Sequence, residues 1–263
     1  MSSRIDEHGE GIDVLMYHSI SNASGPTSIP VEVFRAQIET LRSAGYETAP
    51  LSSLAAWQRG EGTLPRRAVM ITFDDGFQDF ADVAFPILHA HGFTATVFLP
   101  TGRLGGMEDW DGANAPPRRL MSWSAVRELA HQGIAFGGHS VTHTDLTTLA
   151  PDRLRDEIKG SQDEIAQHLG QAVDTFAPPY GRLNDRVRVE LTRWASVSVG
   201  TRLDRANRSS DLTDVPRIEM HYFRSLRLWR TYLGGRASGY LRARRLGRSL
   251  RRWLGLRHGG GSN

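Results

Sequence analysis

The stretch 72–76, with the sequence TFDDG, follows the apolar run 68–71. An apolar run of this kind predicts a buried strand that ends where the two acids begin. The adjacent carboxylates of Asp74 and Asp75 are unfavourable there unless something compensates their charge. A divalent cation does so, because it favours the ionised form of both acids. A plain β-turn with Asp and Gly explains the same residues, so this stretch alone leaves both interpretations open.

A second stretch, 138–143 (GHSVTH), also follows an apolar run, at residues 134–136. Its histidines, His139 and His143, are four positions apart, and they lie on one face if the chain turns helically after the strand. Two imidazoles on one small ion suit zinc. Together with the acids upstream, this pair favours a metal site made of Asp and two His over two unrelated turns.

These stretches resemble the polysaccharide deacetylases, the carbohydrate esterase family with the NodB homology domain. The resemblance covers about residues 13–220, and it includes the permuted members that carry an N-terminal Tyr-His motif. Its motifs occur in this order: 14–18 (VLMYH), 72–76 (TFDDG), 94–98 (TATVF), 139–143 (HSVTH), 176–181 (FAPPYG) and 215–218 (VPRI). The resemblance implies a deformed barrel of parallel strands, and metal-dependent removal of an N-acyl group, usually acetyl, from an amino sugar.

The repeated alternation of strands and helices independently favours parallel strands with outer helices. With the fold that the resemblance implies, we expect a deformed (β/α) barrel of about seven parallel strands with outer helices. Helices are expected at 30–44, 51–58, 79–91, 122–131, 151–169 and 184–194. We place an interruption near Pro86 and a helix cap at Ser124. Residues 103–120 are expected to form a long loop over one end of the barrel, and loops of this length are usually functional.

Active sites of such barrels lie at the C-terminal ends of the strands. The residues that the sequence places at or just after strand ends are His18, Asp74, Asp75, His139 and Tyr180. The candidate metal ligands therefore lie at the positions where such barrels have their active sites.

The resemblance implies a role for each of these residues. Asp75, His139 and His143 are the metal ligands, with zinc as the default and cobalt or nickel able to fill the same set. Asp74 does not ligate the metal and acts as the general base that takes a proton from water. The backbone N–H of Tyr180 helps to hold the oxyanion.

Two positions depart from the common pattern of the family. No Leu-x-His segment, which usually carries the general acid, follows Arg217. His18 is the natural replacement, as in the permuted members; the alternative is that His18 caps its strand and hydrogen-bonds a neighbour. The Arg that usually lies beside the base is Ala177 here. Arg217 can supply that charge by pairing with Asp74, or it can form an ordinary surface salt bridge.

The length of 263 residues fits one barrel domain, and the absence of Cys excludes disulfides. Residues 1–11 are polar and acidic and lack the basic and apolar segments of a secretory signal. No apolar run reaches the roughly 18 residues that a membrane span needs. We therefore expect a cytoplasmic protein.

The charge is unevenly distributed along the chain. Residues 221–263 carry eleven Arg and no acid, whereas the remainder has more acids than bases. We therefore divide the chain into a catalytic domain, 1–220, and a basic tail, 221–263. In the tail, apolar residues recur three or four apart with Arg between them: Leu246, Leu250, Trp253 and Leu254.

This pattern predicts a basic amphipathic helix. Peripheral contact with the inner membrane surface and packing on the barrel both explain it. Because no recognition motif accompanies the charge, a nucleic-acid partner is not expected.

The sequence thus predicts a metal-dependent N-deacetylase of an amino sugar, in a glycan, exopolysaccharide or lipid-linked sugar pathway. A deformylase or cyclic-amide hydrolase on the same scaffold is the related alternative. A non-catalytic carbohydrate-binding protein is the alternative from another class. The complete set Asp74, Asp75, His139 and His143 argues against that last hypothesis, because a non-catalytic protein need not keep a general base.

Overall fold

Strands and helices alternate along residues 11–110 and 116–253, which are the residues that the computed structural model describes. The barrel strands are β1 (Gly11–Tyr17), β5 (Ala68–Phe73), β6 (Thr96–Leu99), β7 (Ala135–Gly138), β8 (Thr175–Phe176), β9 (Val197–Leu203) and β11 (Val215–Glu219). The helices are α1 (Val31–Ser43), α2 (Ser53–Arg59), α3 (Phe85–Ala90), α4 (Trp123–His131), α5 (Pro151–Leu169), α6 (Asp185–Trp194), α7 (Leu226–Leu233) and α8 (Ser238–Trp253). The remaining short strands are β2 (Ser19–Ile20), β3 (Ser28–Ile29), β4 (Glu47–Thr48) and β10 (Ala206–Asn207).

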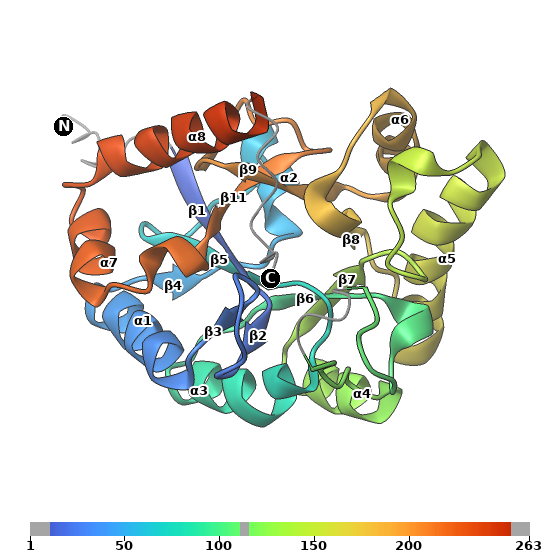
Figure 1. Cartoon of the computed structure of the whole chain (residues 1–263), viewed down its shortest axis with the longest axis horizontal. Coiled ribbons are helices and arrows are strands. Elements are labelled where there is room, and N and C mark those ends of the chain that lie inside the picture. The colour runs from blue at the N-terminus through green and yellow to red at the C-terminus, as the bar shows by residue number, and fades with distance from the viewer. Residues whose placement is uncertain (1–10, 111–115, 254–263) are drawn as a thin grey trace, which may run out of the picture.

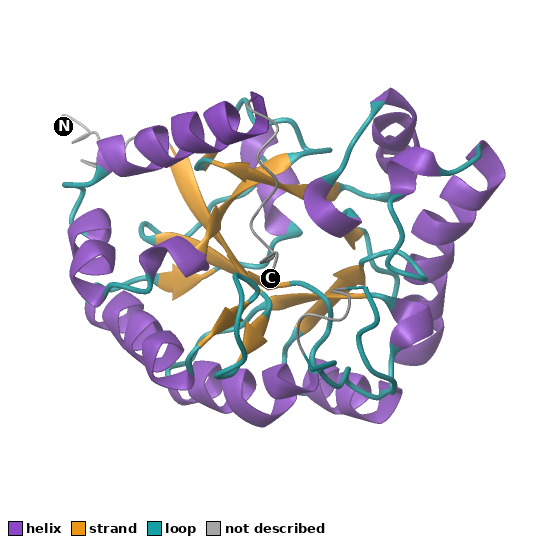
Figure 2. Ribbon diagram, in the orientation of Figure 1, coloured by secondary structure: helices purple, strands orange, loops and turns teal. Residues whose placement is uncertain are grey.

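The sheet closes on itself and the helices lie outside it (Figures 1 and 2). The order around the barrel is β1-β11-β9-β8-β7-β6-β5, and β5 pairs with β1 to complete the ring. All of these pairs are parallel. The predicted deformed barrel of about seven parallel strands with outer helices is therefore confirmed. Outside the ring, β10 pairs with β1 in the antiparallel sense and β4 pairs with the start of β5.

The helix expected at 79–91 is a π-helical segment, Phe80–Ala84, that continues directly into α3, so the predicted interruption near Pro86 is confirmed. Proline has no N–H to donate, and the regular α-helical hydrogen bonding changes just before it. One other local prediction differs from the structure. The cap of α4 is Ser122, not Ser124: the Ser122 hydroxyl accepts from the N–H of Ala125 at 3.3 Å.

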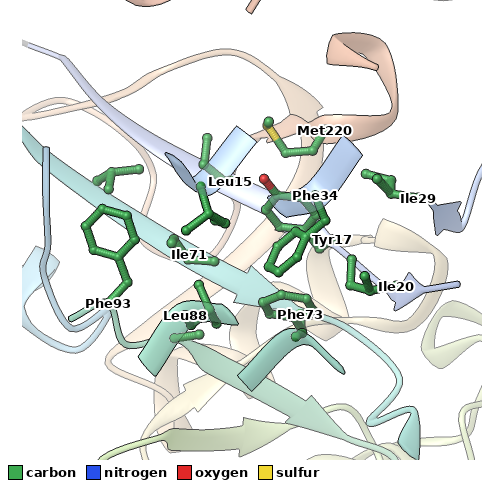
Figure 3. Close-up of a cluster of buried hydrophobic side chains, with 14 of the residues drawn as sticks. Leu15, Tyr17, Ile20, Ile29, Phe34, Ile71, Phe73, Leu88, Phe93 and Met220 are labelled. Carbon is green, nitrogen blue, oxygen red and sulfur yellow. The ribbon is translucent and has the colours of Figure 1, made fainter. Parts of the chain in front are cut away.

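Aromatic packing fixes the strand ends that carry the first motif. Tyr17 stacks on Phe73 with ring centroids 5.2 Å apart, and its other neighbour, Phe34, meets it edge-on at 5.1 Å (Figure 3). All three rings are buried. Because Tyr17 and Phe73 directly precede His18 and Asp74, burial of these rings holds the ends of β1 and β5 side by side.

The first part of the basic tail packs on the barrel. Trp229 of α7 is fully buried, and its Nε1 donates to the backbone oxygen of Gln37 at 3.2 Å. Tyr232 donates its hydroxyl proton to Asp13 of β1 at 2.7 Å. In α8, Leu241 is buried whereas Leu246 is 65% exposed. The core therefore continues across the expected domain boundary at residue 220.

Of the four residues in the predicted amphipathic pattern, the structure describes the side chain of Leu246 alone. The side chains of Leu250 and Trp253, and all of Leu254, lie outside the described residues. In the described ranges, no helix is both long enough and apolar enough to cross a membrane.

Candidate active site

All seven residues predicted for the site are connected in one cluster at the C-terminal ends of the barrel strands. Asp74 and Asp75 follow β5, His18 follows β1, and the two histidines of the second motif follow β7. The other members are Tyr180, in a turn after β8, and Arg217, within β11. Contacts to Asp74 and to the adjacent Asp75 link these residues to one another, as described below.

Left-handed backbone conformations shape the turns of this site. In the described part of the chain, the non-glycine residues with positive φ are Asp75, Ser140, His143 and Tyr180, with φ between 59° and 72°. All four belong to the cluster or to its loops. The chain does not turn helically between the two histidines: two left-handed residues, Ser140 and His143, bend it instead and still bring the imidazoles together. Such conformations cost about 1–3 kcal/mol each and collect at functional sites.

Asp75, His139 and His143 offer three ligand atoms around one point. Nε2 of His139 lies 3.2 Å, and Nε2 of His143 lies 3.1 Å, from the same Oδ1 of Asp75. The three ligand atoms all lie within 4.8 Å of one another, and the three residues are buried. A tetrahedral ion with bonds of about 2.0–2.1 Å holds its ligand atoms about 3.3 Å apart. The cluster therefore fits a divalent metal, and it can leave a position open for water or substrate.

The environment of His139 prepares it to ligate a metal. Its Nδ1 donates to the backbone oxygen of Ala177 at 2.5 Å, so in the neutral imidazole that ligates a metal the lone pair is on Nε2. Ala177 occupies the position where the family usually carries Arg, and here its carbonyl contributes to the site. This contact was not predicted, since a backbone oxygen leaves no signal in the sequence.

The ionisation of the cluster suits a cation. Burial raises the pKa of Asp75, but hydrogen bonds from His139 and His143 outweigh it and hold the pKa well below its usual range. Burial lowers the pKa of His143, which favours the neutral imidazole that ligates metals. Burial lowers the pKa of His139, but the hydrogen bond to Asp75 and the charges of Asp74 and Asp75 together outweigh it, so the pKa is raised and a bound cation would compete with that proton.

Arg217 and Asp74 form a buried, bidentate ion pair. Nη1 and Nη2 of Arg217 donate to the two carboxylate oxygens of Asp74, each at 2.7 Å. Arg217 is only 1% exposed, so the alternative of a surface salt bridge is excluded. Its Nε donates to the oxygen of Gly200 at 2.8 Å and its Nη1 to the hydroxyl of Thr72 at 3.1 Å. Burial raises the pKa of Asp74, but the charge and hydrogen bonds of Arg217, together with the nearby histidines His18 and His139, outweigh it, so the pKa is lowered and the acid stays ionised.

His18 also lies beside the carboxylate of Asp74. Its Nε2 lies 3.8 Å from Oδ2 of Asp74, which is too long for a hydrogen bond. In the structure as described, the His18 side chain makes no hydrogen bond to a strand neighbour. The geometry thus gives no support to the reading in which His18 only caps its strand, and it leaves Nε2 available at the site.

Two aromatic rings flank His143. Trp110 stacks on it at 4.0 Å, and Tyr180 meets it edge-on at 4.9 Å. Trp110 belongs to the predicted loop 103–120, of which residues 111–115 lie outside the described chain. Arg103 fastens this loop by donating to Asp109 at 2.8 Å and to the backbone oxygen of Thr142 at 3.3 Å. The loop therefore contacts the candidate metal centre directly, and the sequence did not reveal this role of Trp110.

Fold and site together define a class: a parallel (β/α) barrel with a candidate divalent-metal centre at its strand ends. The family model for polysaccharide deacetylases matches residues 61–196, about half of the chain. The protein belongs to the polysaccharide deacetylase family.

Curated relatives carry names from the same family. The chain is 33% identical to the poly-β-1,6-N-acetyl-D-glucosamine N-deacetylase of Escherichia coli (strain K12) over 252 residues, which cover 79% of this chain and 36% of that protein. It is 26% identical to the enzyme of the same name from Staphylococcus aureus (strain MSSA476) over 205 residues, covering 73% and 67%. Identity to YxkH of Bacillus subtilis (strain 168) is 26% over 174 residues, covering 66% and 58%. The chain thus spans between about one third and two thirds of the length of these relatives.

Solved structures share the fold. The deacetylase PplD of Streptococcus pyogenes, in complex with acetate, superposes with a TM-score of 0.70 at 25% identity, covering 82% of this chain and 98% of that one. IcaB from Ammonifex degensii gives a TM-score of 0.70 at 24% identity, covering 85% and 98%, a likeness of fold alone.

Proposed function

We propose that this protein is a metal-dependent N-deacetylase that hydrolyses the N-acetyl group of an amino sugar within a polysaccharide. One observation carries the proposal: a buried three-ligand cluster lies beside a second carboxylate, Asp74, that Arg217 holds ionised. A binding protein has no use for that second acid. Because relatives from E. coli and S. aureus are named for poly-β-1,6-N-acetyl-D-glucosamine, this polymer is the first substrate to test.

The metal would be held by Asp75, His139 and His143. When bound, a divalent cation at this position supplies a Lewis acid that polarises the acyl oxygen and lowers the pKa of water. Zinc suits a ligand set of one carboxylate and two imidazoles, and cobalt or nickel can fill it as well.

The other side chains handle the protons. Asp74 takes one proton from the attacking water, and the bidentate contact with Arg217 fixes the direction in which its oxygens point. His18 Nε2 gives a proton to the departing amine nitrogen. Formation of a C–O bond between the water oxygen and the acyl carbon, and cleavage of the C–N bond, release acetate and a free amino sugar. The backbone N–H of Tyr180 serves the developing oxyanion, on the turn that the positive φ of Tyr180 creates beside His143.

Acetate release tests the proposal. Purified protein is incubated with N-acetylated and N-formylated amino sugars, as monomers and as β-1,6-linked oligomers, with zinc or with a chelator. We expect zinc-dependent acetate release from the N-acetylated oligomers. Formate release alone would instead support the deformylase alternative. Binding of the oligomers without release of either acid would support a carbohydrate-binding protein and overturn the proposal.

A further inference from the structure

A buried carboxylate on α5 holds the loop that joins the two histidine ligands. Glu157 is 3% exposed. Its Oε2 accepts from the backbone N–H groups of Val141 and Thr142, each at 2.9 Å. Its Oε1 accepts from the hydroxyl of Thr142 at 2.8 Å. All three donors lie between His139 and His143.

We propose that Glu157 is a positioning residue for the metal site, and this inference rests on the function proposed above. The loop between the ligands is bent by positive φ at Ser140 and His143, so its N–H groups have no helical partners. Side chains take their place: Glu157 accepts two of the N–H groups, and the hydroxyl of Ser140 accepts from the N–H of His143 at 2.9 Å. The shape of the loop therefore depends on these acceptors.

Glu157 is suited to this role because its own position is fixed. It lies in the middle of α5, a helix of 19 residues that lies beside β7 (Figure 1). Leu154 and Ile158, its neighbours on the same face, are buried in the core. The helix thus fixes the carboxylate of Glu157 relative to β7, the strand that directly precedes His139. Both of its oxygens are used, whereas a Gln at this position offers one acceptor oxygen and would turn an N–H₂ group toward a donor.

The consequence for the metal follows from the spacing of the ligands. The two Nε2 atoms meet the same Oδ1 of Asp75 at 3.1 and 3.2 Å only while the loop keeps its bend. Loss of a group that orients ligands typically lowers metal affinity about 10–100-fold. A purely structural anchor would behave differently, because it would lower the stability of the fold and leave the zinc affinity of the folded protein unchanged.

Zinc affinity of the full chain separates the two roles. The dissociation constant is measured by competition with a chromogenic chelator, well below the unfolding midpoint, for the wild type, Glu157→Gln and Glu157→Ala. The matched control is Glu190→Gln in α6. Glu190 is 7% exposed and accepts hydrogen bonds from Arg193 and from the indole N–H of Trp194, both residues of its own helix and not of the loop between the ligands. Thr142→Val removes only the hydroxyl contact to Glu157. It therefore tests the same link between α5 and the loop if the Glu157 variants fail to fold.

We expect the Glu157 variants to bind zinc about 10–100-fold more weakly than the wild type. Thr142→Val should be weakened less, and Glu190→Gln should keep wild-type affinity whatever its loss of stability. Wild-type affinity in Glu157→Gln, or an equal loss in Glu190→Gln, would overturn the inference. A wild-type protein that binds no zinc would instead overturn the proposed function itself.

Discussion

Arg217 of β11 and Asp74 at the end of β5 face each other across β1, which lies between their strands in the barrel. Each guanidinium nitrogen of the pair meets one carboxylate oxygen at 2.7 Å. The contact brings a cation from the last strand of the barrel to an acid on the second. Because Arg217 also binds Thr72 and Gly200, its position is set by three strands, and the orientation of Asp74 is set with it.

The first prediction separates the roles of the adjacent acids. Asp74→Asn should retain zinc and lose activity by at least about 10²-fold, because the amide cannot take a proton from water. Asp75→Asn, the matched control one residue away, should lose zinc as well as activity. Zinc content by atomic absorption and acetate release give both readouts. Near-normal turnover in Asp74→Asn would show that Asp74 is not the base.

The second prediction concerns the stability of the buried pair. Arg217→Met leaves the carboxylate of Asp74 buried without its cation, which should lower the free energy of unfolding by about 3–5 kcal/mol at pH 7. Urea denaturation of the metal-free protein measures this difference. The control Arg188→Met removes half-exposed ion pairs to Asp211 and Asp214, and it should cost about 1 kcal/mol or less. Equal effects of the two substitutions would contradict the prediction.

The same pair should make stability depend on pH in a defined direction. Although burial alone raises the pKa of Asp74, the charge and hydrogen bonds of Arg217, together with the nearby histidines, outweigh it, so the folded-state pKa lies below the unfolded value of about 3.9. The contribution of the pair is then complete above that value, and it is lost as the pH falls through the folded-state pKa. The stability difference between wild type and Arg217→Met should therefore be largest near neutral pH and narrow below about pH 4. A difference that widens on acidification would exclude this origin.

The third prediction tests His18 as the general acid. His18→Gln should retain zinc and lose about 10²–10⁴-fold in kcat toward N-acetyl sugars, since the amine must leave protonated. Toward an acetate ester with an acidic phenol leaving group, which departs without a proton, the loss should be much smaller. The ratio of the two rates is the readout. Equal losses on amide and ester would show that His18 does not act on the leaving group.

The barrel and the ligand set were accessible from the sequence because both depend on local patterns. Strand ends are marked by apolar runs that stop at Gly or at acids, and ligands recur at short spacings such as that of His139 and His143. The shape of the bend between these two histidines could not be predicted, because spacing alone does not distinguish a helical turn from a left-handed one.

The groups that support the site were harder to find. Glu157 lies on the apolar face of α5, between Leu154 and Ile158, and an acid on a buried stripe is a signal that could have been used. The carbonyl of Ala177 and the stacking of Trp110 on His143 depend on tertiary contacts between distant segments. No local sequence pattern records such contacts, so only the folded chain reveals them.

The fourth prediction addresses membrane contact, one of the two roles that the sequence leaves open for the basic tail. In α8, the buried Leu241 faces the barrel while Leu246 is 65% exposed, so the helix packs and still presents an apolar side chain to the outside. Exposed arginines precede Leu246 along the tail: Arg224, Arg227, Arg230, Arg236, Arg242 and Arg244. Each basic residue near an anionic lipid surface contributes about 1 kcal/mol.

We therefore expect the protein to sediment with vesicles that contain phosphatidylserine or phosphatidylglycerol, and to be released at high salt, because the attraction is screened. Leu246→Asp should weaken this binding, since it places a negative charge where an apolar side chain would enter the interface. Val189→Asp in α6 is the matched control, because Val189 is likewise exposed, at 53%, but lies on a helix without this excess of Arg. Equal sedimentation with neutral vesicles, or equal weakening by the two substitutions, would contradict docking through α8. Packing on the barrel would then be the whole role of the described part of the tail.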